Sequence, residues 1–136
     1  MTHELSHLIV EFYERLSSWE HGVVRDKGLT LPQMHTLEIL GANGPMRMKE
    51  LAGRMGVTTG TLTVMIDRLV KNGQVERRPH DTDRRSIIVA LTESGRALFS
   101  EHDDLHLQLT EELTAGLSEG ELEAFEATLR KMIREF

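Results

Sequence analysis

The sequence contains no cysteine among its 136 residues, which excludes a disulfide, a zinc-thiolate site and a thiol redox switch. Aromatic residues make up only 4% of the chain, so few large anchors are available to a core or interface. No apolar run approaches the roughly eighteen residues of a membrane-spanning helix, and the opening MTHELSH has no signal-peptide core. We therefore expect a cytoplasmic protein with no membrane partner, forming a single domain over residues 1–136.

The net charge of −6 is unusual for a protein that binds nucleic acid, but the charges are unevenly distributed. The segment from Arg47 to Arg96 holds ten Lys or Arg against six Asp or Glu, a net charge of +4. The remainder holds six basic and sixteen acidic residues, a net charge of −10. Because DNA phosphates attract basic surfaces, we expect the central segment to face DNA and the acidic remainder to face away.

The central segment predicts two helices followed by a β-hairpin. The first helix, MKELAGRMGV, ends at Gly56, and the Thr58 hydroxyl caps the start of the second. The second helix ends at Asn72-Gly73, where glycine suits a left-handed C-cap. The runs QVERR and SIIVAL predict two strands joined by a charged tip, and residues 45–48 suit a further short strand. The expected fold is mainly α with a small β-wing, a winged helix-turn-helix.

The outward face of the second helix is small and rich in hydroxyls. Burial of Leu62, Ile66 and Leu69 turns the opposite side of this helix outwards. A helix in the major groove presents its N-terminal residues to base edges, where threonine can hydrogen-bond or place its methyl on thymine. The candidate DNA contacts on this helix are Thr58, Thr59, Gly60, Thr63 and Lys71.

The predicted wing tip carries Arg84 and Arg85, whose planar donor forks suit phosphates or a narrow minor groove. The alternative interpretation is that both the helix face and the tip are simply solvated surfaces. Each feature taken singly favours that alternative. Their ordered combination along one segment favours a DNA-binding head.

The stretch TTGTLTVMIDRLVKNGQVERRPHDTDRRSIIVALTESG, residues 58–95, resembles the signature of the MarR family. The matching parts are the recognition helix, the RLxxxGxVxR turn, the DxDRR wing and the LTxxG entry to the next helix. The resemblance implies a dimeric winged-helix transcription regulator with six helices. It further implies that Thr59 and Thr63 face the groove, that Asp83 and Arg85 shape the wing, and that Arg84 approaches the minor groove.

Apolar stripes mark both ends of the chain. Residues 5–23 repeat apolar side chains every three or four positions, and a second stripe follows the capping pattern SEGE at Ser118. Two such helices indicate a homodimer interface that places two heads on a palindromic DNA site. We therefore assign residues 1–32 and 97–136 to dimerisation and residues 33–96 to the head. The alternative is that the two terminal helices pack on each other within one chain.

The histidine spacing predicts a metal site. His102 and His106 lie at i and i+4 on one helix, which puts both imidazoles on one face as two ligands of one ion. His35 lies in the helix that begins near Pro32, and Glu20 or His21 ends the first helix. The alternative is that these are ordinary surface or hydrogen-bonded histidines.

The histidine pattern is similar to that of the zinc-sensing branch of the MarR family. His35 falls on that branch's histidine in the second helix, and His102 and His106 fall on its pair in the fifth. Its acidic ligand is matched approximately by Glu20, with His21 as the alternative. The resemblance implies one zinc per subunit and zinc as corepressor, although His and carboxylate ligands also accept nickel, cobalt or manganese.

Three other functions compete with that of a metal-responsive regulator. A MarR-type repressor released by a small organic, phenolic or aromatic ligand would use a crevice lined by Phe12, Trp19 and Met34, although such residues are more often plain core. An enzyme is not expected, because the sequence has neither HExxH nor a glycine-rich phosphate loop. A pure protein-interaction adaptor would leave the wing arginines unexplained.

Overall fold

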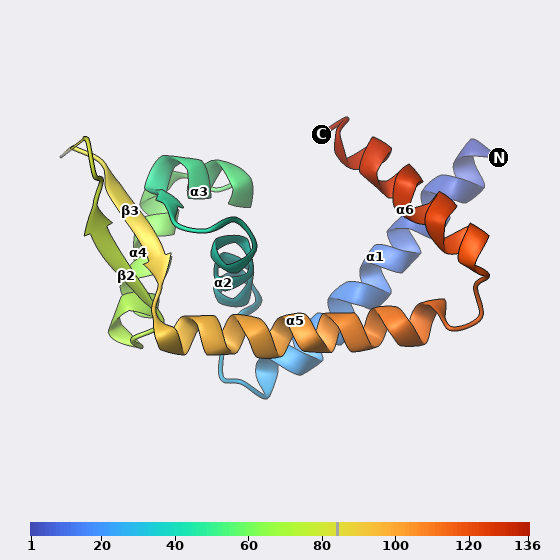
Figure 1. Cartoon of the computed structure of the whole chain (residues 1–136), viewed down its shortest axis with the longest axis horizontal. Helices are drawn as coiled ribbons and strands as arrows, with labels where there is room; N and C mark the ends of the chain where they lie inside the picture. Colours follow the sequence, from blue (N-terminus) through green and yellow to red (C-terminus); the bar gives the residue numbers. More distant parts are fainter. Residues whose placement is uncertain (84) are drawn as a thin grey trace. The chain divides into compact units, whose positions relative to one another are not determined.

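The structure is a computed structural model that describes residues 1–83 and 85–136, so the predicted contact at Arg84 lies outside the described residues. The described chain forms two compact units, residues 1–100 and 101–136. Six helices and a small three-stranded sheet follow one another along the sequence (Figure 1). This confirms the mainly helical fold with a β-wing, while the assignment of all 136 residues to one domain stays a prediction.

The first unit begins with two helices, α1 (Thr2–Arg25) and α2 (Leu31–Asn43). A capping box starts α2: the Thr30 hydroxyl accepts the Gln33 amide N–H, and the Gln33 side chain accepts the Thr30 N–H. Pro32 lies in the first turn, as expected from its missing N–H. The helix continues through the glycine cluster to Asn43 and stops at Gly44, whose φ is 85°.

The predicted helix pair is present as α3 (Met48–Met55) and α4 (Thr59–Lys71). Gly56 ends α3 in the left-handed conformation with φ 67°, which only glycine adopts without strain. Thr58 caps α4 by accepting the Thr61 amide N–H at 3.1 Å. These local signals position α4 directly after a tight turn.

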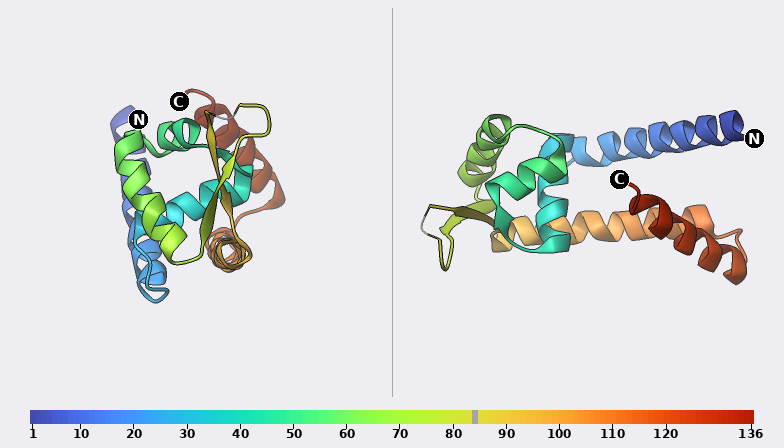
Figure 2. Two further views of the ribbon diagram at one scale, coloured as in Figure 1. Left: turned by 90° about the vertical axis from the view of Figure 1, so that its left-hand side faces the viewer. Right: turned by 90° about the horizontal axis from the view of Figure 1, so that it is seen from above.

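The sheet consists of β1 (Met46–Arg47), β2 (Val75–Pro79) and β3 (Ile87–Leu91) in the order β1-β3-β2. All pairings are antiparallel: Met46 opposes Val89, and Val75 opposes Leu91. The hairpin of β2 and β3 extends beyond α3 and α4 (Figure 2), so it forms the predicted wing beside the helix pair.

The core of the first unit lies between the helices and the sheet. Its fully buried side chains include Met34, Leu37, Leu40, Leu51, Leu62, Ile66, Leu69 and Val89. Gly41 allows a close approach, because a Cβ there would lie 2.3 Å from the Phe99 ring. The same residues that the helical spacing marked as inward on α4 are therefore the ones that pack into this core.

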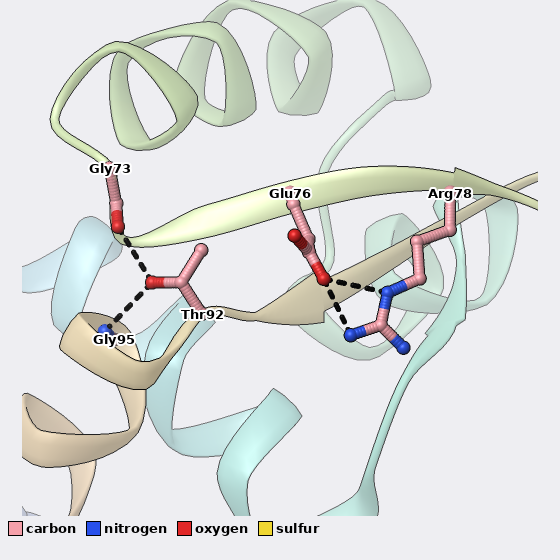
Figure 3. A network of polar contacts seen from close by, with 5 residues as sticks. All are labelled: Gly73, Glu76, Arg78, Thr92 and Gly95. Carbon is pink, nitrogen blue, oxygen red and sulfur yellow. Dashed lines mark hydrogen bonds and ion pairs between the residues drawn. The ribbon is translucent and has the colours of Figure 1, made fainter.

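The start of α5 (Glu93–Thr114) is tied to the end of α4 (Figure 3). The Thr92 hydroxyl donates to the Gly73 carbonyl at 2.6 Å and accepts the Gly95 amide N–H at 3.1 Å. A Cβ on Gly95 would lie 1.9 Å from the Gln74 carbonyl oxygen, so this junction requires glycine. The Thr92 hydroxyl thus links the turn that follows α4 to the first turn of α5.

The second unit contains the remainder of α5 and α6 (Glu119–Ile133). Ser118 and Glu121 form the predicted capping box at the start of α6. None of the described residues of α6 is buried. Its exposed apolar side chains are Leu122, Phe125, Leu129, Met132 and Ile133. No helix within the described ranges has the length and apolar character that crossing a membrane requires.

Candidate nucleic-acid interface and effector ligands

The N-terminal half of α4 presents an exposed, hydroxyl-rich face. Thr59, Gly60 and Thr63 are exposed, and 58% of Val64 is accessible. The Thr63 hydroxyl donates to the Thr59 carbonyl at 2.8 Å. Its proton is therefore used locally, and the methyl group and oxygen lone pairs are left for a partner. Such a face can accept hydrogen bonds and contact a thymine methyl.

Thr58 and Lys71 occupy the two ends of this helix. The Thr58 hydroxyl caps α4 and also donates to the Thr61 hydroxyl at 3.1 Å, so its first role is structural. Lys71 is exposed in the last turn. A flexible ammonium there suits a phosphate rather than a base edge.

Asp83 closes the turn at the wing tip. Its carboxylate accepts the Arg85 amide N–H at 3.0 Å and the Ser86 hydroxyl at 3.1 Å. The hydrogen bond from Arg85, followed by that from Ser86, holds the pKa of the Asp83 carboxyl below its usual value of 3.8. The charged form of Asp83 therefore stabilises the turn that carries exposed Arg85.

His80 organises the same tip, a role that the sequence interpretation missed. Its Nδ1 accepts the amide N–H groups of Thr82 at 3.2 Å and Asp83 at 3.0 Å. Its Nε2 lies 3.0 Å from an Arg47 guanidinium nitrogen of β1. The available signal was its position three residues before Asp83, because a side-chain acceptor there reaches the amides two and three residues ahead.

Two carboxylates of the first unit lie side by side. Glu20 near the end of α1 is 8% exposed, and one of its oxygens lies within 4.8 Å of an oxygen of Glu38 on α2. His21 and His35 are exposed. Glu38 was not singled out in the sequence, although an acid in the otherwise apolar run LEIL, one turn beyond His35, marks it.

Two imidazoles of the second unit also converge. The Nε2 atoms of His102 and His106 lie 3.2 Å apart, and their ring centroids lie 4.8 Å apart. His102 is fully buried. Two nitrogens bound about 2.0–2.1 Å from one tetrahedral ion are about 3.3 Å apart. The pair therefore has the spacing that a single zinc ion needs.

A cavity of about 270 Å³ lies between the N-terminal end of α2 and α4. Its lining residues are Thr30, Pro32, Gln33, Thr61, Val64, Met65 and Arg68. Arg68 supplies a cation to walls that are otherwise largely apolar, which suits a small organic anion. The residues predicted for such a ligand lie elsewhere: Met34 is fully buried in the core, Phe12 is 54% exposed, and Trp19 is half-buried.

The MarR family model matches residues 29–87. The HTH-type transcriptional repressor NicR of Pseudomonas putida is 34% identical over 133 residues, 98% of this chain and 84% of NicR. The multiple antibiotic resistance protein MarR of Salmonella typhimurium is 34% identical over 110 residues, 77% of this chain and 74% of that protein. The chain belongs to the MarR family.

Other MarR-family matches vary in coverage. The chain spans 54% of an uncharacterised HTH-type transcriptional regulator, YfiV of Bacillus subtilis, at 35% identity over 86 residues, 62% of this chain. A mutant of Escherichia coli MarR solved with operator DNA is 30% identical, with a TM-score of 0.73 over 94% of this chain and 92% of that one. BpsR of Bordetella bronchiseptica, whose DNA binding is regulated by 6-hydroxynicotinic acid, is 28% identical, with a TM-score of 0.73 over 95% and 98% of the two chains.

These relatives establish the chain as a MarR-family DNA-binding transcriptional regulator. Its relatives and structural neighbours are regulators, not enzymes, in agreement with the sequence prediction. Membership of the family is compatible with either a metal ion or an organic molecule as the effector.

Proposed function

We propose that the protein is a homodimeric repressor that binds a palindromic operator by placing α4 in the major groove. The exposed, hydroxyl-rich start of α4 carries this proposal, because the same unit holds the net positive segment and the wing. Further support comes from the relatives: NicR is a repressor, and MarR of Escherichia coli has been solved with operator DNA.

Fluorescence anisotropy of a labelled duplex from upstream of the protein's own gene tests the proposal at physiological salt. Thr63→Ala is expected to lose about five- to tenfold in affinity, because a lost base contact costs about 1 kcal/mol or more. Thr128→Ala is the matched control, since Thr128 donates to a carbonyl four residues earlier at the same 2.8 Å. Equal effects of the two substitutions would contradict a role for Thr63 in binding.

The exposed apolar side chains of the terminal helices support the homodimer. On α1 these are Leu5, Leu8, Ile9, Val10, Phe12 and Tyr13, each at least 47% exposed. Burying one large apolar side chain contributes about 1.5–3 kcal/mol, so a second copy of the chain gains by covering them. Sedimentation equilibrium is expected to give a dimer for the natural protein and a monomer for Phe125→Asp.

We infer that the effector is a metal ion, most simply zinc. The proposed ligands are His35, His102 and His106 with Glu20 or His21, and Glu38 is a further candidate. The imidazole spacing supports the proposal in one unit, and the Glu20–Glu38 approach supports it in the other. As a corepressor, zinc must bind the DNA-competent state more tightly than the alternative state.

Operator anisotropy with added zinc and with chelator tests the metal. His102→Ala is expected to abolish the zinc response, whereas His7→Ala, from the exposed i,i+4 pair His3 and His7, should retain it. Comparing Glu38→Gln with His35→Gln in a zinc competition titration identifies the further ligand, since only the ligand substitution lowers zinc affinity. An unchanged zinc response in His102→Ala would show that the ligand assignment is wrong.

The second candidate effector is a small organic anion bound beside Arg68. The cavity between α2 and α4 favours it, and BpsR provides a precedent in which 6-hydroxynicotinic acid regulates DNA binding. An aromatic carboxylate such as 6-hydroxynicotinic acid would then dissociate the protein from the operator, and it would do so even when chelator has removed any metal. Arg68→Gln should abolish that release, while metal-independent operator binding in the natural protein would favour this candidate over zinc.

A further inference from the structure

Two methionine sulfurs meet one buried hydroxyl at the centre of the head. Thr36 of α2 is fully buried, and its oxygen lies 3.2 Å from Sδ of Met55 and 3.4 Å from Sδ of Met65. Met55 ends α3, and Met65 lies in the middle of α4. This contact therefore joins α2 to both helices of the DNA-reading pair.

The Thr36 hydroxyl has only one proton to give. The Pro32 carbonyl oxygen lies 2.8 Å away and is a stronger acceptor than a thioether. The hydroxyl proton is therefore directed to Pro32, and the two sulfurs pack against the oxygen as soft, weakly polar groups. An oxygen atom added to either sulfur would need a hydrogen-bond donor in a site whose single donor is already engaged.

Both sulfurs belong to half-buried residues, and Met65 lines the cavity of about 270 Å³ beside α4. A small oxidant can therefore approach Met65 from this cavity. With no cysteine in the chain, no thiol competes for that oxidant. Among the remaining methionines, Met34 and Met46 are buried in the core, Met48 is half-buried at the start of α3, and Met1 and Met132 are exposed.

We propose that Met65, with Met55 as its neighbour, is an oxidation site that couples peroxides to DNA binding. The thioether sulfur attacks one peroxide oxygen, a new S–O bond forms, and the O–O bond breaks; the proton on the transferred oxygen passes to the departing hydroxide. The methionine becomes a sulfoxide, and hydrogen peroxide is reduced to water. The polar S=O group then disrupts the packing of α2 against α3 and α4 and changes the presentation of the recognition helix.

The test treats the full-length protein with graded hydrogen peroxide and maps each methionine by peptide mass spectrometry. Addition of one oxygen at Met65 or Met55 is expected to parallel a loss of about tenfold in operator affinity and a fall in Tm of the head. Methionine sulfoxide reductase should restore both. The affinity readout rests on the proposed function, whereas the mass map and Tm test the site even if no operator is bound.

The double variant Met55→Leu/Met65→Leu removes both sulfurs at nearly constant side-chain volume. If the double variant does not fold, each single variant is tested instead. The variant is expected to resist peroxide, while Met48→Leu, which removes the other half-buried methionine of α3, should respond like the natural protein. The proposal is overturned if the peptides of Met55 and Met65 stay unmodified while Tm and affinity fall, or if the double variant is equally sensitive.

Discussion

At the scale of single residues, the tightest constraint in the head is Gly95, within the first turn of α5. Gly95 is buried, and any Cβ there would lie 1.9 Å from the Gln74 carbonyl oxygen and 3.3 Å from a Leu91 methyl. Backbone cannot move as easily as the end of a side chain. Position 95 therefore tolerates no larger residue without a shift of the chain before β2.

Gly95→Ala is expected to lower the free energy of unfolding by about 3 kcal/mol, the upper range for overpacking a core. Urea denaturation followed by circular dichroism measures it. Gly53→Ala is the control, because nothing lies within 4 Å of a Cβ at this α3 position. That substitution should raise stability by about 0.5–1 kcal/mol, since alanine is a better helix former than glycine. Similar losses at the two positions would contradict the close approach.

Asp83 gives the wing tip a predictable dependence on acid. Its pKa in the folded protein is lower than the usual 3.8, so the carboxylate contributes stability above that value. This contribution is lost as the pH falls through the lowered folded pKa. The Arg85 amide resonance in NMR spectra should therefore shift in that acidic range and stay constant at neutral pH. Asp83→Asn should abolish this titration; an unchanged titration in the variant would assign it to another group.

At the scale of elements, α4 depends on the cap at its start. Thr58→Ala is expected to cost about 1 kcal/mol, because the Thr61 N–H loses its side-chain acceptor. Thr58→Ser should restore both stability and operator affinity by retaining the hydroxyl. Thr58→Asp separates the two roles: it caps the helix but places a negative charge near phosphates. Thermal melting and operator anisotropy of the same three variants provide the measurements.

Elements defined by local signals were predictable from the sequence. Gly56 ends α3, Thr58 starts α4 and Ser118 starts α6 as expected, because each effect involves residues within a few positions. Gly22 lies within α1, which continues to Arg25, because a single glycine lowers helix stability only modestly and does not by itself end a long helix.

Contacts between distant residues were not predictable in the same way. Glu20 and Glu38 approach each other across eighteen positions, and the Thr36 contact joins residues from three helices. Helical periodicity indicates which face is inward, but not which inward groups from separate elements meet. In the candidate site, the exposed face of α4 and the histidine pair were therefore predictable, because each lies on one helix. Glu38, His80 and the methionine pair were missed, because their roles depend on contacts with other parts of the chain.

At the scale of the whole molecule, positive charge is concentrated in the segment that is expected to bind DNA. Arg77 and Arg78 are engaged by Asp67 and Glu76, so the exposed Arg85 and Lys71 are better placed to reach phosphates. The acidic excess lies in the rest of the sequence. Binding should therefore weaken steeply with salt although the whole chain is negatively charged.

Arg85→Glu is expected to reduce operator affinity and to lower the slope of log affinity against log salt by about 0.9, the value for one phosphate contact. Anisotropy titrations between low and physiological salt measure the slope. Lys131→Glu on α6 makes the same charge change outside the head and should leave the slope unchanged. If operator affinity depended only on the net charge of the protein, both variants would show the same slope of log affinity against log salt.

The Thr92 hydroxyl also has a consequence for the order in which the head folds. It bonds to Gly73 and to Gly95, and the whole β2–β3 hairpin lies between Gly73 and Thr92 (Figure 3). The hydroxyl can make both bonds only after that hairpin has closed and brought the ends together. Completion of the first turn of α5 is thus a late event that reports on hairpin closure, and Thr92→Ala should accelerate unfolding more than it slows folding.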